Sequence, residues 1–174
     1  MATRLPGRQT IAARAPREPL VFVRNETART GVPVAASFTA WVDAALRGAR
    51  WRKRAEVNIL ITDGERGRGY NQQFRQRDYA TNVLSFPYEP MPHEKSAPLG
   101  DLVICAPVVA LEAIAQGKKP RDHWAHMTVH GVLHLIGFDH IDDGDAERME
   151  ALETRVLAGL GVADPYRAAM TETQ

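Results

Sequence analysis

The chain has 174 residues, of which 44% are hydrophobic and 25% are charged. This length and composition are ordinary for one globular domain with a sizeable core. The 22 Lys and Arg residues against 21 Asp and Glu residues give a net charge of +1, which neither favours nor excludes nucleic acid as a partner. No apolar run approaches membrane-spanning length, and the single cysteine excludes an internal disulfide and is typical of a reducing compartment.

The two ends of the chain differ in composition from its middle. The first seventeen residues contain four arginines and no acidic residue. We expect a basic, disordered arm over residues 1–17, one domain over residues 18–168 and a short tail over residues 169–174.

Hydrophobic periodicity predicts alternating strands and helices along the domain. The predicted strands cover residues 19–24, 57–62, 82–86 and 101–105, and the predicted helices cover residues 34–46, 70–75, 108–116, 122–136 and 145–160. A loop broken by Gly64, Gly67 and Gly69 precedes the second helix, and a proline-rich loop follows the third strand. This pattern predicts an α+β domain in which helices pack on one small sheet.

A cluster of histidines lies near the end of the predicted helix 122–136. His130 and His134 are four residues apart, so their imidazoles lie one helical turn apart on the same face and can bind one metal ion. His126 shares that face but lies about 12 Å from His134 along the axis, which is too far for the same ion. Gly137 permits a sharp turn, and after this turn His140 can return to the metal. Three histidines with an open fourth position are typical of catalytic zinc.

The spacing of these residues matches that of metzincin proteases, with one departure. Their general base is a glutamate directly after the first histidine, and this chain has Gly131 there. The pattern therefore does not support the protease reaction. It still predicts a metal that lowers the pKa of a bound water and polarises an oxygen of the substrate. The plain alternative is a helix with two hydrogen-bonded histidines and an unrelated third.

The stretch over residues 123–140, HWAHMTVHGVLHLIGFDH, closely resembles the signature of the YbeY family of bacterial rRNA-maturation endoribonucleases. Residues 71–87 and 100–104 match two further blocks of the family, in the same order. The likeness extends over roughly residues 55–168. The family usually has a proline at the position of Ala80 and a tyrosine at that of Phe138, and neither position is a proposed ligand.

The resemblance implies a mostly parallel four-stranded sheet with an antiparallel edge strand, and a cleft between the ligand helix and the sheet. It implies a cytoplasmic, metal-dependent endoribonuclease that is specific for single-stranded RNA and has one zinc ion as its cofactor. The expected role is maturation of the 16S rRNA 3′ end and ribosome quality control, with the small ribosomal subunit as a partner. The oligomeric state stays open.

Two residues are candidates for catalysis beside the metal ligands. Arg75 matches the functional arginine of the family, and its guanidinium fork suits phosphate oxygens. Without the resemblance it would be one surface arginine among many. Asp139 could orient a ligand or accept a proton, or it could equally cap the ligand loop.

Other residues are expected near the RNA. Ser85 and Asp101 are placed in the cleft by the resemblance alone, and aromatics such as Phe86 or Tyr88 could stack on bases. Nine basic residues against three acidic ones between residues 47 and 77 could mark a face for phosphates, or only a solvated surface.

Two alternative functions remain. One is another metal-dependent hydrolase, such as a peptidase. The other is a non-enzymatic ribosome-assembly factor with a structural metal, which would need a fourth protein ligand.

Overall fold

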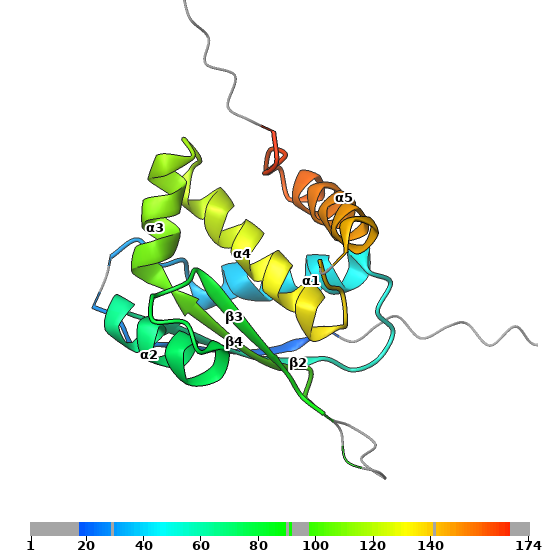
Figure 1. Cartoon of the computed structure of the whole chain (residues 1–174). Coiled ribbons are helices and arrows are strands. Elements are labelled where there is room, and N and C mark those ends of the chain that lie inside the picture. The colour runs from blue at the N-terminus through cyan, green and yellow to red at the C-terminus, as the bar shows by residue number, and fades with distance from the viewer. Residues whose placement is uncertain (1–17, 29, 90, 92–97, 141, 168–174) are drawn as a thin grey trace, which may run out of the picture.

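The computed structural model describes residues 18–28, 30–89, 91, 98–140 and 142–167. The expected arm over residues 1–17, the tail over residues 169–174 and most of the proline-rich loop lie outside these residues. Within them the order of elements is β1 α1 β2 α2 β3 β4 α3 α4 α5 (Figure 1). The predicted α+β class is confirmed.

The four strands form one mixed sheet in the order β1-β2-β4-β3. Their bounds are Leu20–Asn25 (β1), Glu56–Thr62 (β2), Val83–Pro87 (β3) and Gly100–Cys105 (β4). β1, β2 and β4 are parallel to one another, and β3 runs antiparallel to β4 at the edge. The predicted topology of the sheet, including its antiparallel edge strand, is therefore confirmed.

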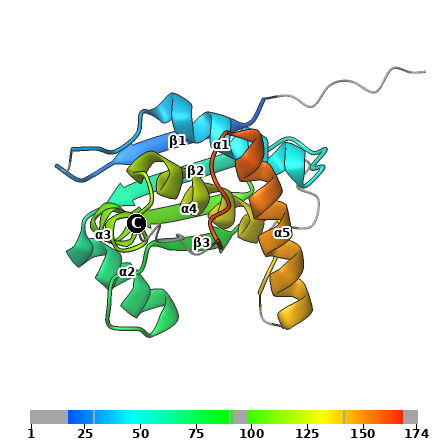
Figure 2. The ribbon, with the colours of Figure 1, turned by 90° about the horizontal axis from the view of Figure 1, so that it is seen from above.

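Helices lie on both faces of this sheet. Their bounds are Ala35–Gly48 (α1), Gly64–Arg75 (α2), Ala106–Ala115 (α3), Pro120–Leu135 (α4) and Asp143–Gly159 (α5). Figure 1 shows α1 and α4 over one face and α2 on the opposite side. α3 and α5 both contact α4, and in the view of Figure 2 they lie on either side of it.

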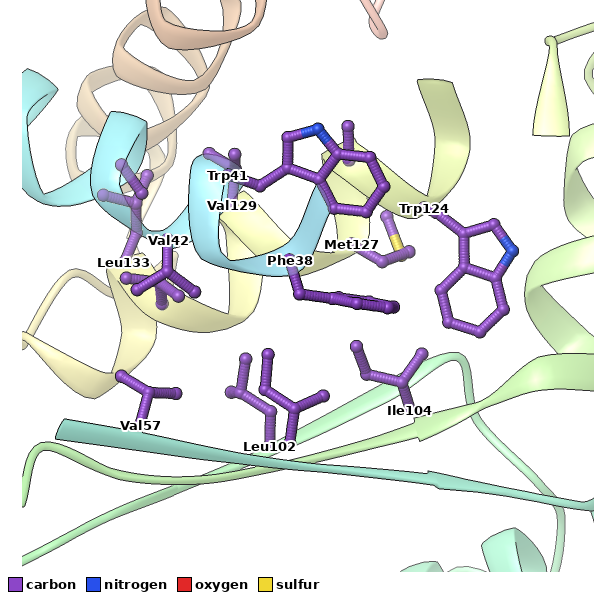
Figure 3. Close-up of a cluster of buried hydrophobic side chains, with 14 of the residues drawn as sticks. Phe38, Trp41, Val42, Val57, Leu102, Ile104, Trp124, Met127, Val129 and Leu133 are labelled. Atoms are coloured by element: carbon purple, nitrogen blue, oxygen red, sulfur yellow. The ribbon is translucent and has the colours of Figure 1, made fainter. Parts of the chain in front are cut away.

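The main core lies between the sheet and the layer formed by α1 and α4 (Figure 3). The Phe38 ring meets Trp41 and Trp124 edge to face, with ring centroids 5.3 and 5.8 Å apart. Val57, Leu102 and other strand residues close this core from below (Figure 3). Helix α4 is buried along most of its length, so its position is fixed by packing on several sides.

The start of α2 differs from the prediction. The expected loop over Gly64, Gly67 and Gly69 is the first part of the helix, which begins after Asp63. The Asp63 carboxylate accepts a hydrogen bond of 2.9 Å from the Arg66 backbone N–H and caps the helix. Gly67 lies against β4, because a Cβ there would come within 2.9 Å of the Cys105 sulfur. Capping and close packing thus outweigh the low helix propensity of glycine.

None of the described helices has the length and apolar character that crossing a bilayer requires.

Candidate active site

The end of α4 holds two histidines side by side. The His130 and His134 rings have centroids 4.6 Å apart, and their Nε2 atoms are 3.1 Å apart. Two imidazole nitrogens bound to one tetrahedral zinc ion are roughly 3.3 Å apart, given Zn–N bonds of about 2.0–2.1 Å. The pair therefore has the spacing that a shared metal ion requires.

The chain then turns sharply through Gly137, whose φ is +97°. The Gly137 N–H donates to the His134 carbonyl at 3.1 Å, and the Phe138 N–H donates to the Leu133 carbonyl at 3.0 Å. This pair of bonds is the Schellman motif, which ends many helices and favours glycine at the left-handed position. The turn expected from the sequence is therefore present.

The turn returns His140 to the pair on α4. Its ring centroid lies 5.0 Å from that of His134 and 5.7 Å from that of His130. One ligand nitrogen from each of the three rings lies within 4.8 Å of the others, so the three histidines form a group that could hold a metal ion. Burial lowers the pKa of His134, and the neighbouring His130 and His140 lower it further. His134 is therefore neutral near pH 7, which is the form that binds metals.

A buried carboxylate lies behind His130. Glu153 of α5 is fully buried, and its Oε1 lies 2.7 Å from His130 Nδ1 while its Oε2 lies 3.0 Å from His126 Nε2. The Tyr166 hydroxyl also donates to Oε2. Burial alone would raise the pKa of Glu153, but hydrogen bonds from His126 and His130 lower it to about 2. His126 thus forms a hydrogen bond with Glu153, which agrees with its exclusion from the group of His130, His134 and His140.

An open cleft of about 750 Å³ borders the histidines. One wall is the end of α4 with the loop after it, and the other is β3 with the segment that precedes it. The lining residues that carry polar side chains include Asn71, Arg75, Arg77, Tyr79, Thr81, Asn82, Ser85, Asp139 and the three histidines. The cleft therefore combines a potential metal site with two arginines, a combination suited to a phosphodiester.

Arg75 and Asp139 both line this cleft together with the metal group. The Asp139 carboxylate accepts a hydrogen bond of 2.8 Å from the His140 backbone N–H, which is the capping alternative considered above. Ser85 also lines the cleft, and its hydroxyl donates to the Gly131 carbonyl at 3.2 Å. The catalytic roles of Arg75 and Asp139 stay predictions.

Asp101 and Phe86 do not lie in the cleft, contrary to the expectation. The two residues pair across β3 and β4 and line a groove on the opposite face of the sheet. Asp101 there accepts a hydrogen bond of 2.8 Å from Asn58, and the Phe86 ring lies 4.9 Å from that of Phe74. Among the described residues, Tyr79 and Phe138 are the aromatic residues that line the cleft, and the sequence did not single out Tyr79.

Gly131 faces the sheet and not the cleft. A Cβ at this position would lie 2.9 Å from Leu102 Cδ2 and 3.3 Å from Val83 Cγ2. A glutamate here would enter the packed interface with β3 and β4, so it could not serve the histidines as a base. This geometry supports the interpretation of Gly131 made from the sequence.

Most of the basic excess between residues 47 and 77 is not directed at the cleft. Arg47 pairs with Asp43, and Arg66 and Arg68 pair with Glu26 and Asp78. Arg75 and Arg77 are the members of this stretch that line the cleft. The surface for phosphates is therefore narrower than composition suggested.

Comparisons with known proteins identify the family of this chain. A family model described as Endoribonuclease YbeY matches residues 22–161. The chain belongs to this family. It is 55% identical over 141 residues to Endoribonuclease YbeY of Alkalilimnicola ehrlichii, covering 80% of this chain and 85% of that protein. It is 50% identical over 146 residues to Endoribonuclease YbeY of Cellvibrio japonicus, covering 84% of this chain and 82% of that protein.

A solved structure shares the fold of this chain. The solution structure of TM1509 from Thermotoga maritima aligns with a TM-score of 0.53 and covers 85% of this chain and 99% of that one. At 20% identity this likeness supports the fold alone. The resemblance read from the histidine stretch is thus confirmed for the family, and the fold it implied is confirmed as well.

Two buried or half-buried carboxylates that support the histidines, Glu153 and Glu112, were not predicted from the sequence. Glu153 lies on the apolar stripe of α5 beside Met149 and Leu152, and a carboxylate on a buried face must have partners. That position was the signal available. Glu112 of α3 bonds to the buried His123 at 2.7 Å and accepts from Asn82 at 3.1 Å.

Proposed function

We propose that this protein is a metal-dependent endoribonuclease that cleaves single-stranded RNA, with one zinc ion held by His130, His134 and His140. The main support for this proposal is that these three histidines converge on a cleft that Arg75 also lines. Membership of the family and the name of the relatives supply the substrate class. We further propose a cytoplasmic role in maturing the 3′ end of 16S rRNA on the small ribosomal subunit, and in ribosome quality control.

The donor set fits zinc. Within the described part of the chain, the group consists of three histidines without a Cys or carboxylate as a fourth ligand. Three imidazoles with an open position are typical of catalytic zinc and not of closed structural sites. When bound, the ion would supply Lewis acidity toward a water molecule or a phosphoryl oxygen.

The residues of the chain have distinct tasks in this proposal. The Arg75 guanidinium binds the non-bridging oxygens of the scissile phosphate through its planar fork and offsets the charge that develops there. Arg77 donates to the Tyr79 hydroxyl at 3.1 Å, so a cation and an aromatic ring lie together at the cleft for a neighbouring phosphate and base. Asp139 caps the ligand loop through one carboxylate oxygen, which accepts from the His140 backbone N–H, and its other oxygen would accept a proton beside that ligand.

An open cleft at the edge of the sheet suits a single strand better than a duplex. The cleft is open to solvent and is bordered on one side by an edge strand of the sheet. A flexible single strand can present an unstacked nucleotide to such a cleft, whereas an A-form duplex keeps its bases paired and its backbone regular.

The decisive test is cleavage of an unstructured RNA by the zinc-loaded protein. Wild-type protein should cut this RNA, and it should not cut the same RNA paired with its complement. The double variant H130A/H134A should lose cleavage while its circular dichroism spectrum stays that of the wild type. Chelation should abolish wild-type activity, and added zinc should restore it. A fully active double variant would remove the metal from the mechanism.

The biological part of the proposal has its own test. Cells depleted of this protein should accumulate 16S rRNA with an unprocessed 3′ end, and expression of the wild-type chain should reverse this. The H130A/H134A variant should not. Reversal by that variant would support the assembly-factor alternative, and metal-dependent peptide cleavage by the purified protein would support the peptidase alternative.

A further inference from the structure

The carboxylate of Glu153 determines where two histidines carry their protons. A carboxylate is a hydrogen-bond acceptor only, and its oxygens lie 2.7 Å from His130 Nδ1 and 3.0 Å from His126 Nε2. Both of these nitrogens must therefore carry a hydrogen. Glu153 is fully buried, so bulk solvent does not compete for these hydrogen bonds.

The tautomer of His130 decides whether its other nitrogen can bind a metal. With hydrogen on Nδ1, the neutral ring has its lone pair on Nε2. That Nε2 lies 3.1 Å from His134 Nε2, on the side of the metal group. The opposite tautomer would place a hydrogen between the two nitrogens and block the site. Glu153 thus selects the form of His130 that is able to bind.

A second metal ion between His126, His130 and Glu153 is the competing interpretation, because their ligand atoms also lie within 4.8 Å of one another. The nitrogen–oxygen distances of 2.7 and 3.0 Å are hydrogen-bond lengths, and they need no ion. An ion at Nδ1 would also require His130 to lose both of its ring protons. The arrangement is therefore a hydrogen-bonded support for one metal site.

Tyr166 completes the support from a distant part of the chain. Its hydroxyl donates to Glu153 Oε2, and its ring meets the His126 ring edge to face at 5.6 Å. The Lys118 ammonium donates to the Pro165 carbonyl at 2.8 Å and holds this C-terminal segment against the start of α4. Three donors thus hold the Glu153 carboxylate in place. His130 donates to Oε1, and His126 and Tyr166 donate to Oε2.

We propose that Glu153 and Tyr166 are positioning residues for His130, which fix its tautomer and ring orientation so that Nε2 faces the metal group. This inference rests on the proposed metal site. Neither residue would touch the RNA or the ion. Partners of this kind typically change metal affinity or activity by about 10- to 100-fold when they are removed.

The first experiment reads the tautomer directly in metal-free protein. Long-range proton–nitrogen correlation NMR should show His130 as the Nδ1–H tautomer in the wild type. In E153Q one acceptor oxygen is replaced by an amide donor, so His130 or His126 must change its protonation, and the His130 signals should shift toward a mixed population. The matched control is E147Q, the same exchange at an exposed position of α5, which should leave the spectrum of His130 unchanged.

The second experiment measures zinc affinity by competition with a chromogenic chelator. E153Q should bind zinc about 10- to 100-fold more weakly than the wild type, whereas E147Q should match the wild type. Y166F loses one hydroxyl at a partly exposed residue and should give a smaller loss. If E153Q does not fold, Y166F carries the test, and wild-type affinity in Y166F would overturn the proposal.

The outcomes separate this inference from the proposed function. A wild-type protein that binds no zinc would refute the metal site, while the tautomer of His130 would still report on Glu153. A folded E153Q with wild-type affinity and an unchanged His130 tautomer would refute the positioning role and leave the metal site intact.

Discussion

Substitution of Gly131 tests why this chain lacks the protease glutamate. In Gly131→Ala the new Cβ would lie 2.9 Å from Leu102 Cδ2 and 3.3 Å from Val83 Cγ2. Overpacking of this kind costs about 1–3 kcal/mol, and the better helix propensity of alanine returns about 1 kcal/mol. We therefore expect G131A to lower the free energy of unfolding by up to about 2 kcal/mol.

The matched control is Gly69→Ala in α2. Gly69 is also inside a helix, but a Cβ there meets nothing within 4 Å. G69A should raise the free energy of unfolding by about 0.5–1 kcal/mol, which is the propensity gain alone. Urea unfolding followed by tryptophan fluorescence measures both variants. If G131A is stabilised as much as G69A, Gly131 is not closely packed against the sheet.

The larger exchange Gly131→Glu restores the protease spacing. Its carboxylate would be buried against Leu102 and Val83 without a partner, so G131E should unfold or lose more than about 4 kcal/mol of stability. We expect no peptidase activity from it. A folded G131E with zinc-dependent peptide cleavage would refute the assignment of this face of α4 to the core.

Three further predictions concern the cleft, acid stability and the ligand turn. R75A should lower the rate of RNA cleavage about 100-fold, and R75K should recover only part of it because lysine lacks the bidentate fork; R47A, at an arginine paired with Asp43, is the control in the same cleavage assay. Burial alone would raise the pKa of Glu112, but hydrogen bonds from His123 and Asn82 lower it below 4.5. The Glu112 carboxylate therefore binds a proton more tightly in the unfolded state than in the folded state. Its contribution to stability is present above about pH 4.5 and is lost as the pH falls below that value. Urea unfolding across this range should show a steeper acid loss for the wild type than for E112Q, and equal slopes would contradict the prediction. G137A places alanine at a φ of +97° and should cost about 1–2 kcal/mol in the same unfolding assay; stability equal to that of the wild type would mean that the turn can form without glycine.

Periodicity predicted those parts of the fold in which one face is uniformly apolar. In the predicted helix 34–46 the apolar side chains recur with helical spacing, and the structure buries this face of α1 (Phe38, Trp41, Val42, Ala45, Leu46). The start of α2 could not be found in this way, because Gly67 is favoured there by the nearby Cys105 from a strand that lies far along the chain. Local propensity contains no information about such a contact.

The error at Asp101 has a simple geometric origin. Side chains alternate between the two faces of a strand, and the sequence does not tell which face a helix will cover. Ser85 pairs with Leu102 on the face covered by α4, whereas Phe86 pairs with Asp101 on the other. Ser85 and Asp101 therefore point to opposite faces of the sheet and do not line the same cleft. This difference follows from the register of β3 on β4, which the sequence does not reveal.

The histidine group was accessible from sequence because its geometry is local. His130 and His134 are separated by one turn, and Gly137 allows the chain to turn back within a few residues. Glu153 was not accessible in the same way, because its contact with His130 depends on how α5 packs on α4.

The anchoring of the three histidines is unequal. Two of them project from a helix wedged into the core, so moving either one means breaking the packing that holds the domain together. His140 follows the Gly137 turn on an exposed stretch, where local opening needs far less free energy than global unfolding. If the three histidines hold an ion, local opening of the turn would withdraw His140 from it, so the stability of the Gly137 turn would affect how tightly the site binds its metal.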